Sequence, residues 1–119
     1  MAKQITISEL EDLKDLKDNY LIDVRTPEEW EIIGRPDGEA LGMKTHFVSY
    51  QFQQGDGRIL NPNFEKEMDN LNLDKSKKIF FICRSGQRSD KTAEIYEKKG
   101  FDTYNVSDGF YVDEVTQSW

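Results

Sequence analysis

The chain has 119 residues, of which 36% are hydrophobic and 33% are charged, and its formal net charge is −7. A chain of this length is expected to form one domain around one hydrophobic core. No apolar run approaches the roughly 20 residues that span a bilayer, and residues 1–10 lack the basic and apolar regions of a signal peptide. We therefore expect a soluble domain that works in the cytoplasm and makes no membrane contact.

The acidic balance and the low cysteine and histidine content exclude several kinds of function. Asp and Glu number 23 against 16 Lys and Arg, so the chain repels a phosphate backbone at long range, and we expect no nucleic-acid partner. The sequence has one cysteine, Cys83, and one histidine, His46, which excludes an internal disulfide and a zinc site of four Cys and His ligands. We assign no chemistry to His46, and Cys83 is the candidate nucleophile.

A first strand-to-helix unit is predicted at the start of the chain. Ile5 and Ile7 alternate as in a short strand, and Ser8 with Glu11 fits a capping box that opens a helix. The apolar positions of this helix are Leu10, Leu13 and Leu16.

A second strand-to-helix unit is predicted from residue 20 onward. Residues 20–24 form a short apolar strand. Thr26 then caps a helix that has Pro27 at its first position, and Glu29 completes its capping box. The chain therefore repeats the order of strand and helix.

The middle of the chain has the weakest pattern. Glycines are frequent over residues 34–57, where a strand over residues 45–49 is the one element that we predict. Asn61 and Pro62 are expected to open a helix whose apolar face consists of Phe64, Met68 and Leu71.

The last third of the chain contains the clearest strand. Residues 79–82 are all apolar, which is typical of a strand buried on both faces of a parallel sheet, so we place it at the centre of the sheet. A helix over about residues 88–99 follows, with Gly100 as its left-handed cap, and residues 103–106 form a final short strand. Alternating strands and helices predict an α/β fold.

A loop that contains Cys83 joins the central strand to the following helix. Residues 83–89 read CRSGQRS, so a thiol, a glycine and two arginines lie where ligands bind in open parallel sheets. Backbone N–H groups and the positive end of the helix favour the thiolate over the thiol. We expect Arg88 to support the loop and Arg84 to line the mouth of a pocket.

The sequence resembles the rhodanese family of sulfurtransferases, in particular its single-domain members. The resemblance rests on LIDVRTPEEW at residues 21–30, CRSGQRS at 83–89, GF at 100–101 and YNV at 104–106, in the family's order and spacing. It implies one rhodanese-like α/β domain over residues 1–119, in which helices flank both faces of a central, mostly parallel five-stranded sheet.

The resemblance also implies a reaction. Cys83 accepts a sulfane sulfur as a persulfide, and the residues that bind the substrate are Arg84, Ser85, Gly86, Gln87 and Arg88. The expected partners are an anionic donor, such as thiosulfate or a persulfide, and a small-molecule or protein thiol acceptor. No metal or organic cofactor is needed, and a monomer and a homodimer are both consistent with the sequence.

The length of the loop separates sulfur transfer from phosphate chemistry. Cysteine phosphatases with a similar loop have Cys-x5-Arg, whereas Arg88 follows Cys83 as Cys-x4-Arg. The shorter loop is expected to close around a single sulfur and to fit phosphate poorly. We therefore expect neither phosphate hydrolysis nor arsenate reduction.

Asp23 and Arg25 are expected to support the Cys83 loop rather than to bind substrate. Asp23 ends a strand beside the loop, and Arg25 is placed to pair with Glu29 or Glu28 one turn later. Aromatic side chains after the strands either line the pocket mouth or cover the edges of the core, namely Tyr50, Phe52, Phe110 and Tyr111. Trp119 is either an anchor for a partner or a cover for the core.

Two segments depart from the family pattern. A glycine, histidine and proline stretch of the family is replaced at residues 34–40 by GRPDGEA, and a common Gly-Gly pair is replaced by Asp108 and Gly109. These departures and the acidic surface motivate an alternative function, in which the domain carries sulfur or binds a partner without turning over thiosulfate.

Overall fold

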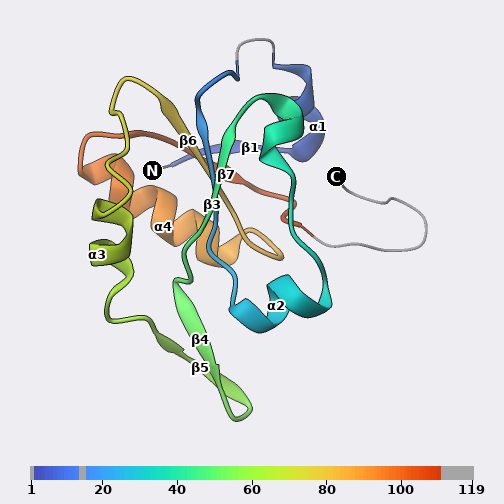
Figure 1. Cartoon of the computed structure of the whole chain (residues 1–119), viewed down its shortest axis with the longest axis vertical. Coiled ribbons are helices and arrows are strands. Elements are labelled where there is room, and N and C mark those ends of the chain that lie inside the picture. Colours follow the sequence, from blue (N-terminus) through green and yellow to red (C-terminus); the bar gives the residue numbers. More distant parts are fainter. Residues whose placement is uncertain (1, 14–15, 111–119) are drawn as a thin grey trace.

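A computed structural model describes residues 2–13 and 16–110 of the chain. Its main sheet has five parallel strands in the order β1-β7-β6-β2-β3 (Figure 1). The strands are β1 (Lys3–Ile5), β2 (Tyr20–Asp23), β3 (Lys44–Phe47), β6 (Lys78–Ile82) and β7 (Asp102–Val106). The apolar strand β6 is the middle one, which confirms its predicted position.

Helices lie on both faces of this sheet, as predicted. They are α1 (Ile7–Asp12), α2 (Pro27–Ile32), α3 (Phe64–Asp69) and α4 (Gln87–Lys98), with a short 3-10 helix, η1 (Gly38–Leu41). Because side chains of a strand alternate between faces, Ile79 and Phe81 pack with the α3 and α4 side, whereas Phe80 and Ile82 pack with Leu10 of α1. Two apolar layers therefore enclose the sheet, and they hold the ends of its strands in place.

The second strand-to-helix unit and the last helix agree with the sequence analysis. Thr26 caps α2 with Pro27 at its first position, and the capping box with Glu29 is formed. Helix α4 begins at Gln87, and Gly100 follows it with a left-handed φ of 95°. These two helices set the position of the candidate site.

The first unit was predicted two residues too late. Ile7 is the first residue of α1 rather than part of the strand, and Thr6 forms the capping box with Glu9 in place of Ser8 with Glu11. Helix α1 ends at Asp12, so Leu13 and Leu16 lie beyond it. The error arose because Thr6 and Glu9 carry the same spacing as Ser8 and Glu11, and the strand ends early enough to use the first pair.

Helix α3 also differs slightly from its prediction. It begins at Phe64, and Asn61 instead closes the turn before it, where its Oδ1 atom accepts a hydrogen bond from the Asn63 amide at 2.9 Å. Phe64 and Met68 are buried as predicted, but the third predicted position, Leu71, lies beyond the end of α3 at Asp69 and packs against the core from the following turn.

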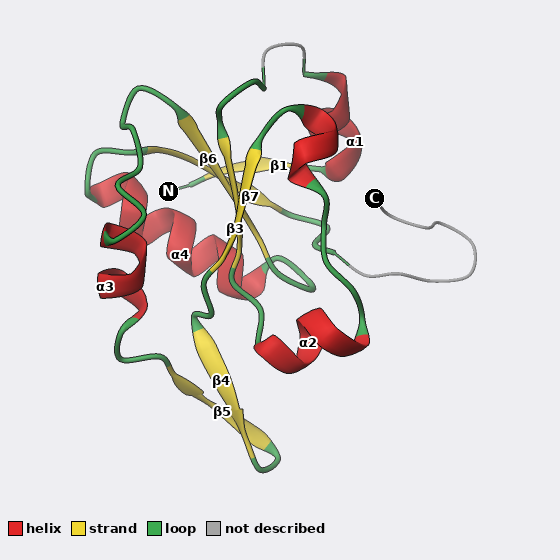
Figure 2. Ribbon diagram, in the orientation of Figure 1, coloured by secondary structure: helices red, strands yellow, loops and turns green. Residues whose placement is uncertain are grey.

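A hairpin of β4 (Gln51–Gln54) and β5 (Gly57–Leu60) was missed by the sequence analysis. It forms a separate antiparallel pair that extends away from the main body (Figure 2). The signal in the sequence was the turn Gly55-Asp56, with φ of 58° at Gly55, between two short stretches of extended residues. Within residues 2–13 and 16–110, no helix is long and apolar enough to cross a membrane.

Candidate active site

Cys83 lies directly after the central strand β6, and its side chain is fully buried. Its Sγ atom accepts hydrogen bonds from the Gly86 amide at 3.1 Å, the Ser89 amide at 3.4 Å and the Ser89 hydroxyl at 3.3 Å. Three donors therefore converge on one sulfur atom, an arrangement that stabilises negative charge on it.

The sulfur takes the place of a side-chain cap for helix α4. Gly86, the residue before the helix, makes no side-chain capping bond, and Ser89 is the third helical residue. A capping side chain normally accepts from the amide of that third residue, and here the Cys83 Sγ atom does so. The positive end of the α4 dipole is thus directed at the sulfur.

A second layer of hydrogen bonds fixes the donors. The single hydrogen of the Ser89 hydroxyl is shared between the Cys83 Sγ atom and Oδ1 of Asn105 on β7. The Asn105 side-chain amide in turn donates to the Gly86 carbonyl at 3.0 Å and to Oε1 of Gln4 at 2.8 Å. Asn105 therefore holds both residues that contact the sulfur, and sequence reasoning assigned it no such role.

The loop is packed against the chain that follows β7, and this explains two glycines. A Cβ atom at Gly86, where φ is 89°, would press on the Ser107 backbone, and one at Gly109, where φ is 69°, would overlap the Arg84 carbonyl. Asp108, which replaces a glycine of the family pattern, accepts a hydrogen bond from the Ile7 amide at 2.9 Å. The altered Asp108-Gly109 pair therefore joins the active loop to the start of α1.

Asp23 and Arg25 form a fully buried ion pair, with the Arg25 Nη2 atom 2.7 Å from Asp23 Oδ2. Arg25 also donates to the Gly34 carbonyl at 2.7 Å, and its guanidinium lies 4.8 Å from the Phe110 ring centroid. The predicted pairing of Arg25 with Glu29 or Glu28 is wrong, because the Arg25 guanidinium bonds instead to the carboxylate of Asp23, two residues earlier in the same connection. The Phe110 amide donates to the Cys83 carbonyl at 2.7 Å, so this pair lies against the loop.

Glu29 instead forms a two-point ion pair with Arg88. The distances from the Arg88 guanidinium nitrogens to the Glu29 carboxylate oxygens are 2.7 and 3.0 Å. Burial opposes ionisation of Glu29, but hydrogen bonds from Arg88 and Thr26 outweigh it and lower the pKa of Glu29 from 4.5 to about 2. Arg88 is thus held by α2, which is consistent with the supporting position expected for it.

A pocket of about 440 Å³ opens beside the loop and is lined by Gln51, Arg58, Arg84, Ser85, Gln87, Arg88 and Lys91. Four of the five predicted substrate-binding residues line it, and the amide of the fifth, Gly86, donates to the sulfur. Arg84 is exposed at the pocket, where the sequence analysis placed it. The lining residues Gln51 and Arg58 were missed, because nothing in a single sequence indicates that the hairpin approaches the loop. Lys91 was also missed, although its helical spacing from Gln87 and Arg88 places it on their side of α4.

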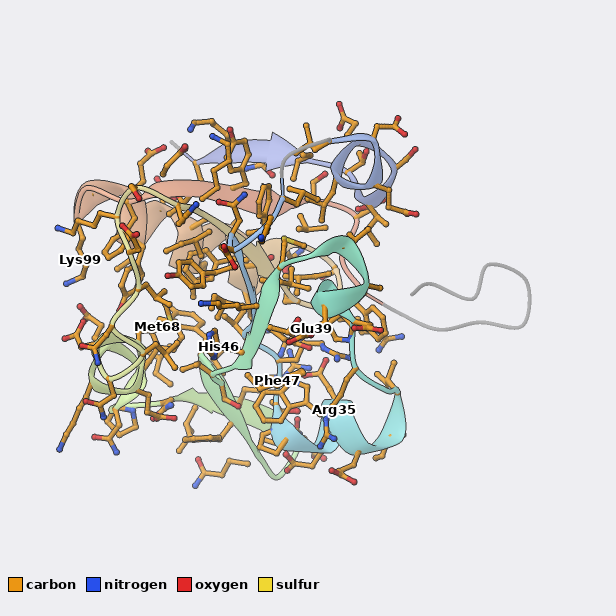
Figure 3. All side chains as sticks on the ribbon, turned by 45° about the horizontal axis from the view of Figure 1, so that its top comes forward. Arg35, Glu39, His46, Phe47, Met68 and Lys99 are labelled. Atoms are coloured by element: carbon orange, nitrogen blue, oxygen red, sulfur yellow. The ribbon has the colours of Figure 1, made fainter. Side chains whose placement is uncertain are left out.

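None of the remaining candidates within the described residues donates a hydrogen bond to the Cys83 Sγ atom. Phe110 is buried against the core, and Phe52 borders a different, apolar groove beside α2. Tyr50 packs edge-to-face on Phe64. His46 lies on the edge strand β3, two strands from β6, and burial lowers its pKa (Figure 3). Tyr111 and Trp119 lie outside the described residues.

The part of the chain that the structure describes contains no group of three or more His, Cys, Asp or Glu side chains that could hold a metal ion.

Curated relatives match most of this chain. RP600 of Rickettsia prowazekii, an uncharacterized protein, is 37% identical over 102 residues, which cover 84% of this chain and 76% of RP600. A Bacillus subtilis protein named "Putative sulfurtransferase YtwF" is 37% identical over 90 residues, which cover 76% of this chain and 68% of YtwF.

Solved structures share the fold. The crystal structure of Rv0390 from M. tuberculosis has a TM-score of 0.74 and 34% identity, and the match covers 98% of this chain and 86% of Rv0390. A rhodanese-like domain protein from Staphylococcus aureus has a TM-score of 0.63 and 27% identity, with 98% of both chains covered. The family model for the rhodanese-like domain matches residues 6–112. This chain therefore belongs to the rhodanese-like domain family.

Proposed function

We propose that this protein is a sulfurtransferase that carries a sulfane sulfur on Cys83. The observation that supports this most directly is the convergence of two amides and one hydroxyl on the Cys83 Sγ atom at the start of α4. Such donors stabilise a thiolate before the reaction and a persulfide anion after it. We place the reaction in the cytoplasm, where small thiols are kept reduced.

In the first half-reaction, the Cys83 thiolate attacks the outer sulfur of thiosulfate. A new S–S bond forms to Cys83, the S–S bond of thiosulfate breaks, and sulfite leaves with the electron pair. One thiolate and one dianion become one persulfide anion and one dianion, so total charge is unchanged. Gln87 and Arg88 lie in the first turn of α4, where backbone amides have no acceptor within the helix. These two amides are therefore the donors that bind the added sulfur.

In the second half-reaction, an acceptor thiolate attacks the outer sulfur of the Cys83 persulfide. The S–S bond to Cys83 breaks, Cys83 regains its thiolate, and the acceptor leaves as a persulfide. Both half-reactions exchange one anion for another at the same donors, so the site needs no cofactor for either step.

The donor has to displace part of the loop to reach the sulfur. Cys83 is fully buried, whereas Arg84 and Ser85 above it are exposed. Exposed side chains change rotamer on the picosecond to nanosecond scale. We therefore expect movement of these side chains, rather than unfolding of the sheet, to admit the donor.

The proposal is tested by incubating the protein with thiosulfate, removing the excess and weighing the intact chain. We expect an adduct of one sulfur atom that cyanide removes as thiocyanate. The Cys83→Ser variant serves as the matched control and should gain no adduct. Absence of the adduct in the wild-type protein contradicts the proposal.

Three further assays separate the alternative functions: discharge of the adduct by small thiols, hydrolysis of an aryl phosphate, and reduction of arsenate. An adduct that no small thiol discharges supports a sulfur carrier that acts on a protein partner. Hydrolysis of an aryl phosphate, or reduction of arsenate with a thiol donor, supports oxyanion chemistry instead. We expect neither of these activities, because the Cys-x4-Arg loop closes tightly around one sulfur.

A further inference from the structure

We infer that the pocket beside the Cys83 loop contains a separate subsite for the acceptor, and that this acceptor is a small thiol with two or more negative charges. The subsite consists of Arg58, Arg84 and Lys91, which come from three different elements. This inference rests on the proposed sulfur transfer and adds the class of acceptor that the site selects.

The hairpin places Arg58 at the pocket by simple alternation. Gln51 pairs with Leu60 and Gln53 with Arg58, so Gln51 and Arg58 share one face of the hairpin. Phe52 and Ile59 lie on the opposite face. The pocket lining includes Gln51 and Arg58, whereas Phe52 borders the apolar groove beside α2. The hairpin therefore directs Gln51 and Arg58 toward the reactive loop, from a face that also carries Gln53 and the exposed Leu60.

Positive charge accumulates in the pocket although the whole chain carries −7. Four cationic side chains line it, and the carboxylate that pairs with two of them, Glu29, already forms a two-point pair with Arg88. Arg58 lies 3.7 Å from the same carboxylate, which cannot neutralise both guanidiniums. Among the described residues, neither Arg84 nor Lys91 has an ion-pair partner. The pocket thus retains an excess of positive charge that attracts anions.

The size of the pocket indicates what kind of anion fits. Its volume of about 440 Å³ falls within the roughly 300–1,000 Å³ typical of sites for organic ligands. Thiosulfate has five non-hydrogen atoms and fills only part of this volume. The remaining space has Arg58 and Lys91 in its lining and room for the carboxylates of an organic thiol, with Gln51 and Gln87 as further hydrogen-bond donors.

The subsite orients the acceptor for the second half-reaction. With its carboxylates on Arg58 and Lys91, the acceptor presents its thiolate to the outer sulfur of the Cys83 persulfide. The new S–S bond forms as the S–S bond to Cys83 breaks. The acceptor thiolate becomes a persulfide anion and Cys83 regains its thiolate, so the total charge is unchanged. The cations also offset the repulsion between the two anions, which opposes their approach.

The experiment uses wild-type protein loaded with sulfur from thiosulfate and freed of excess donor. Discharge is followed by mass spectrometry with mercaptosuccinate, which carries two carboxylates, and with neutral 2-mercaptoethanol. We expect kcat/KM to favour mercaptosuccinate by about tenfold at low salt after correction for thiolate fraction, and the preference to shrink as salt rises.

Variants test which side chains are responsible. Arg58→Ala and Lys91→Ala are each expected to lower the preference about fivefold, mainly through KM, and Arg58→Lys should retain most of it. Arg35→Ala is the matched control, because Arg35 pairs with Glu31 at 2.7 Å and lies over Phe47, away from the pocket (Figure 3). It should leave the preference unchanged.

A binding measurement separates failure of this inference from failure of the proposed function. Methylthiosuccinate, which cannot accept sulfur, should bind Cys83→Ser protein by calorimetry and lose about fivefold in affinity on Arg58→Ala. If the wild-type protein forms a persulfide but shows no charge preference, or keeps it in the Arg58→Ala Lys91→Ala double variant, the subsite is wrong. If methylthiosuccinate binds as expected but no persulfide forms, the subsite stands and sulfur transfer fails.

Discussion

Two strand-to-helix connections lie side by side at the carboxyl ends of β2 and β6, and they differ in which group accepts the hydrogen bonds at the start of the helix. The connection from β2 to α2 begins at Asp23, which pairs in register with Ile82, the residue before Cys83 in the connection from β6 to α4. In the first, Thr26 caps the helix and the charge of Asp23 is matched by Arg25. In the second, no side chain caps the helix except the sulfur itself.

The difference shows how the start of a helix after a parallel strand becomes either a purely structural feature, with Thr26 at the cap position, or a candidate reactive site, with the left-handed Gly86 at the cap position and the sulfur three residues earlier. Glu29 offers its own amide to Thr26 as Ser89 offers its amide to Cys83, at the same helical position. The neutral hydroxyl of Thr26 accepts the bond in the first helix, and it is not a nucleophile there. In the second helix the Cys83 sulfur accepts the bond from the equivalent amide, that of Ser89, and a sulfur atom is able to carry a negative charge there. Glu29 and Arg88 then link the two helices.

Removing Arg25 tests the structural half of this comparison and should have the largest effect. The Arg25→Met variant leaves the buried Asp23 charge unmatched, which is expected to lower the free energy of unfolding by about 3–5 kcal/mol. Urea unfolding followed by tryptophan fluorescence measures the loss. Arg35→Met, which breaks an exposed pair with Glu31, should cost at most about 1 kcal/mol. Equal losses in the two variants contradict the structural role of Arg25.

Acid tests the link between the two connections. The folded protein holds the pKa of Glu29 at about 2, below the value of 4.5 that it has when unfolded, so its contribution is complete above pH 4.5 and is lost as pH falls toward 2. That contribution is at most about 2 kcal/mol, because solvent at the pocket screens the pair.

The variant that isolates this effect is Glu29→Gln. Its free energy of unfolding should change less between pH 5 and pH 3 than that of the wild-type protein. Glu31→Gln, at an exposed position on the same helix, should retain the wild-type dependence on pH. An unchanged acid dependence in Glu29→Gln shows that Glu29 does not link the helices in the way described.

Removing one donor from the sulfur sharpens the reactive half of the comparison. Ser89→Ala deletes the hydroxyl that lies 3.3 Å from the Cys83 Sγ atom while keeping the amide. Loss of a hydrogen bond to a charged atom, worth about 1.5 kcal/mol, should slow persulfide formation about tenfold. Thr92→Val is the control, because the Thr92 hydroxyl bonds to the Ser89 carbonyl and not to the sulfur. A rate equal to that of Thr92→Val contradicts the role of the hydroxyl.

The sequence predicted the parts of the molecule that depend on local chemistry. The Thr26-Pro27-Glu29 start of α2 and the buried run of β6 follow from capping and from burial on two faces, and both are confirmed. The family resemblance, carried by the residues around Asp23 and Cys83, is confirmed by the match over residues 6–112. The roles of the loop residues stay predictions that the experiments above test.

What the sequence did not predict depends on contacts between distant segments. Asn105 reaches the Cys83 loop only because β7 pairs with β6, and Arg58 reaches the pocket only because the hairpin folds toward it. Arg25 pairs with Asp23, two residues before it, and not with Glu29. The carboxylate of Glu29 pairs instead with Arg88, which lies on another helix. Spacing along the sequence indicates which neighbouring side chains are able to pair, but the packing of distant segments decides which ion pair forms.

The bond between Asn105 and Gln4 has a consequence for the order in which the protein assembles. These two residues are separated by 101 positions, and contacts over such separations form late because closing a long loop costs entropy. On the ribosome, Cys83 is synthesised before Asn105 exists. A chain that ends before Asn105 therefore contains Gly86 and Ser89 without the bonds that fix them, and the donors around Cys83 reach their final positions only once β1 and β7 have paired.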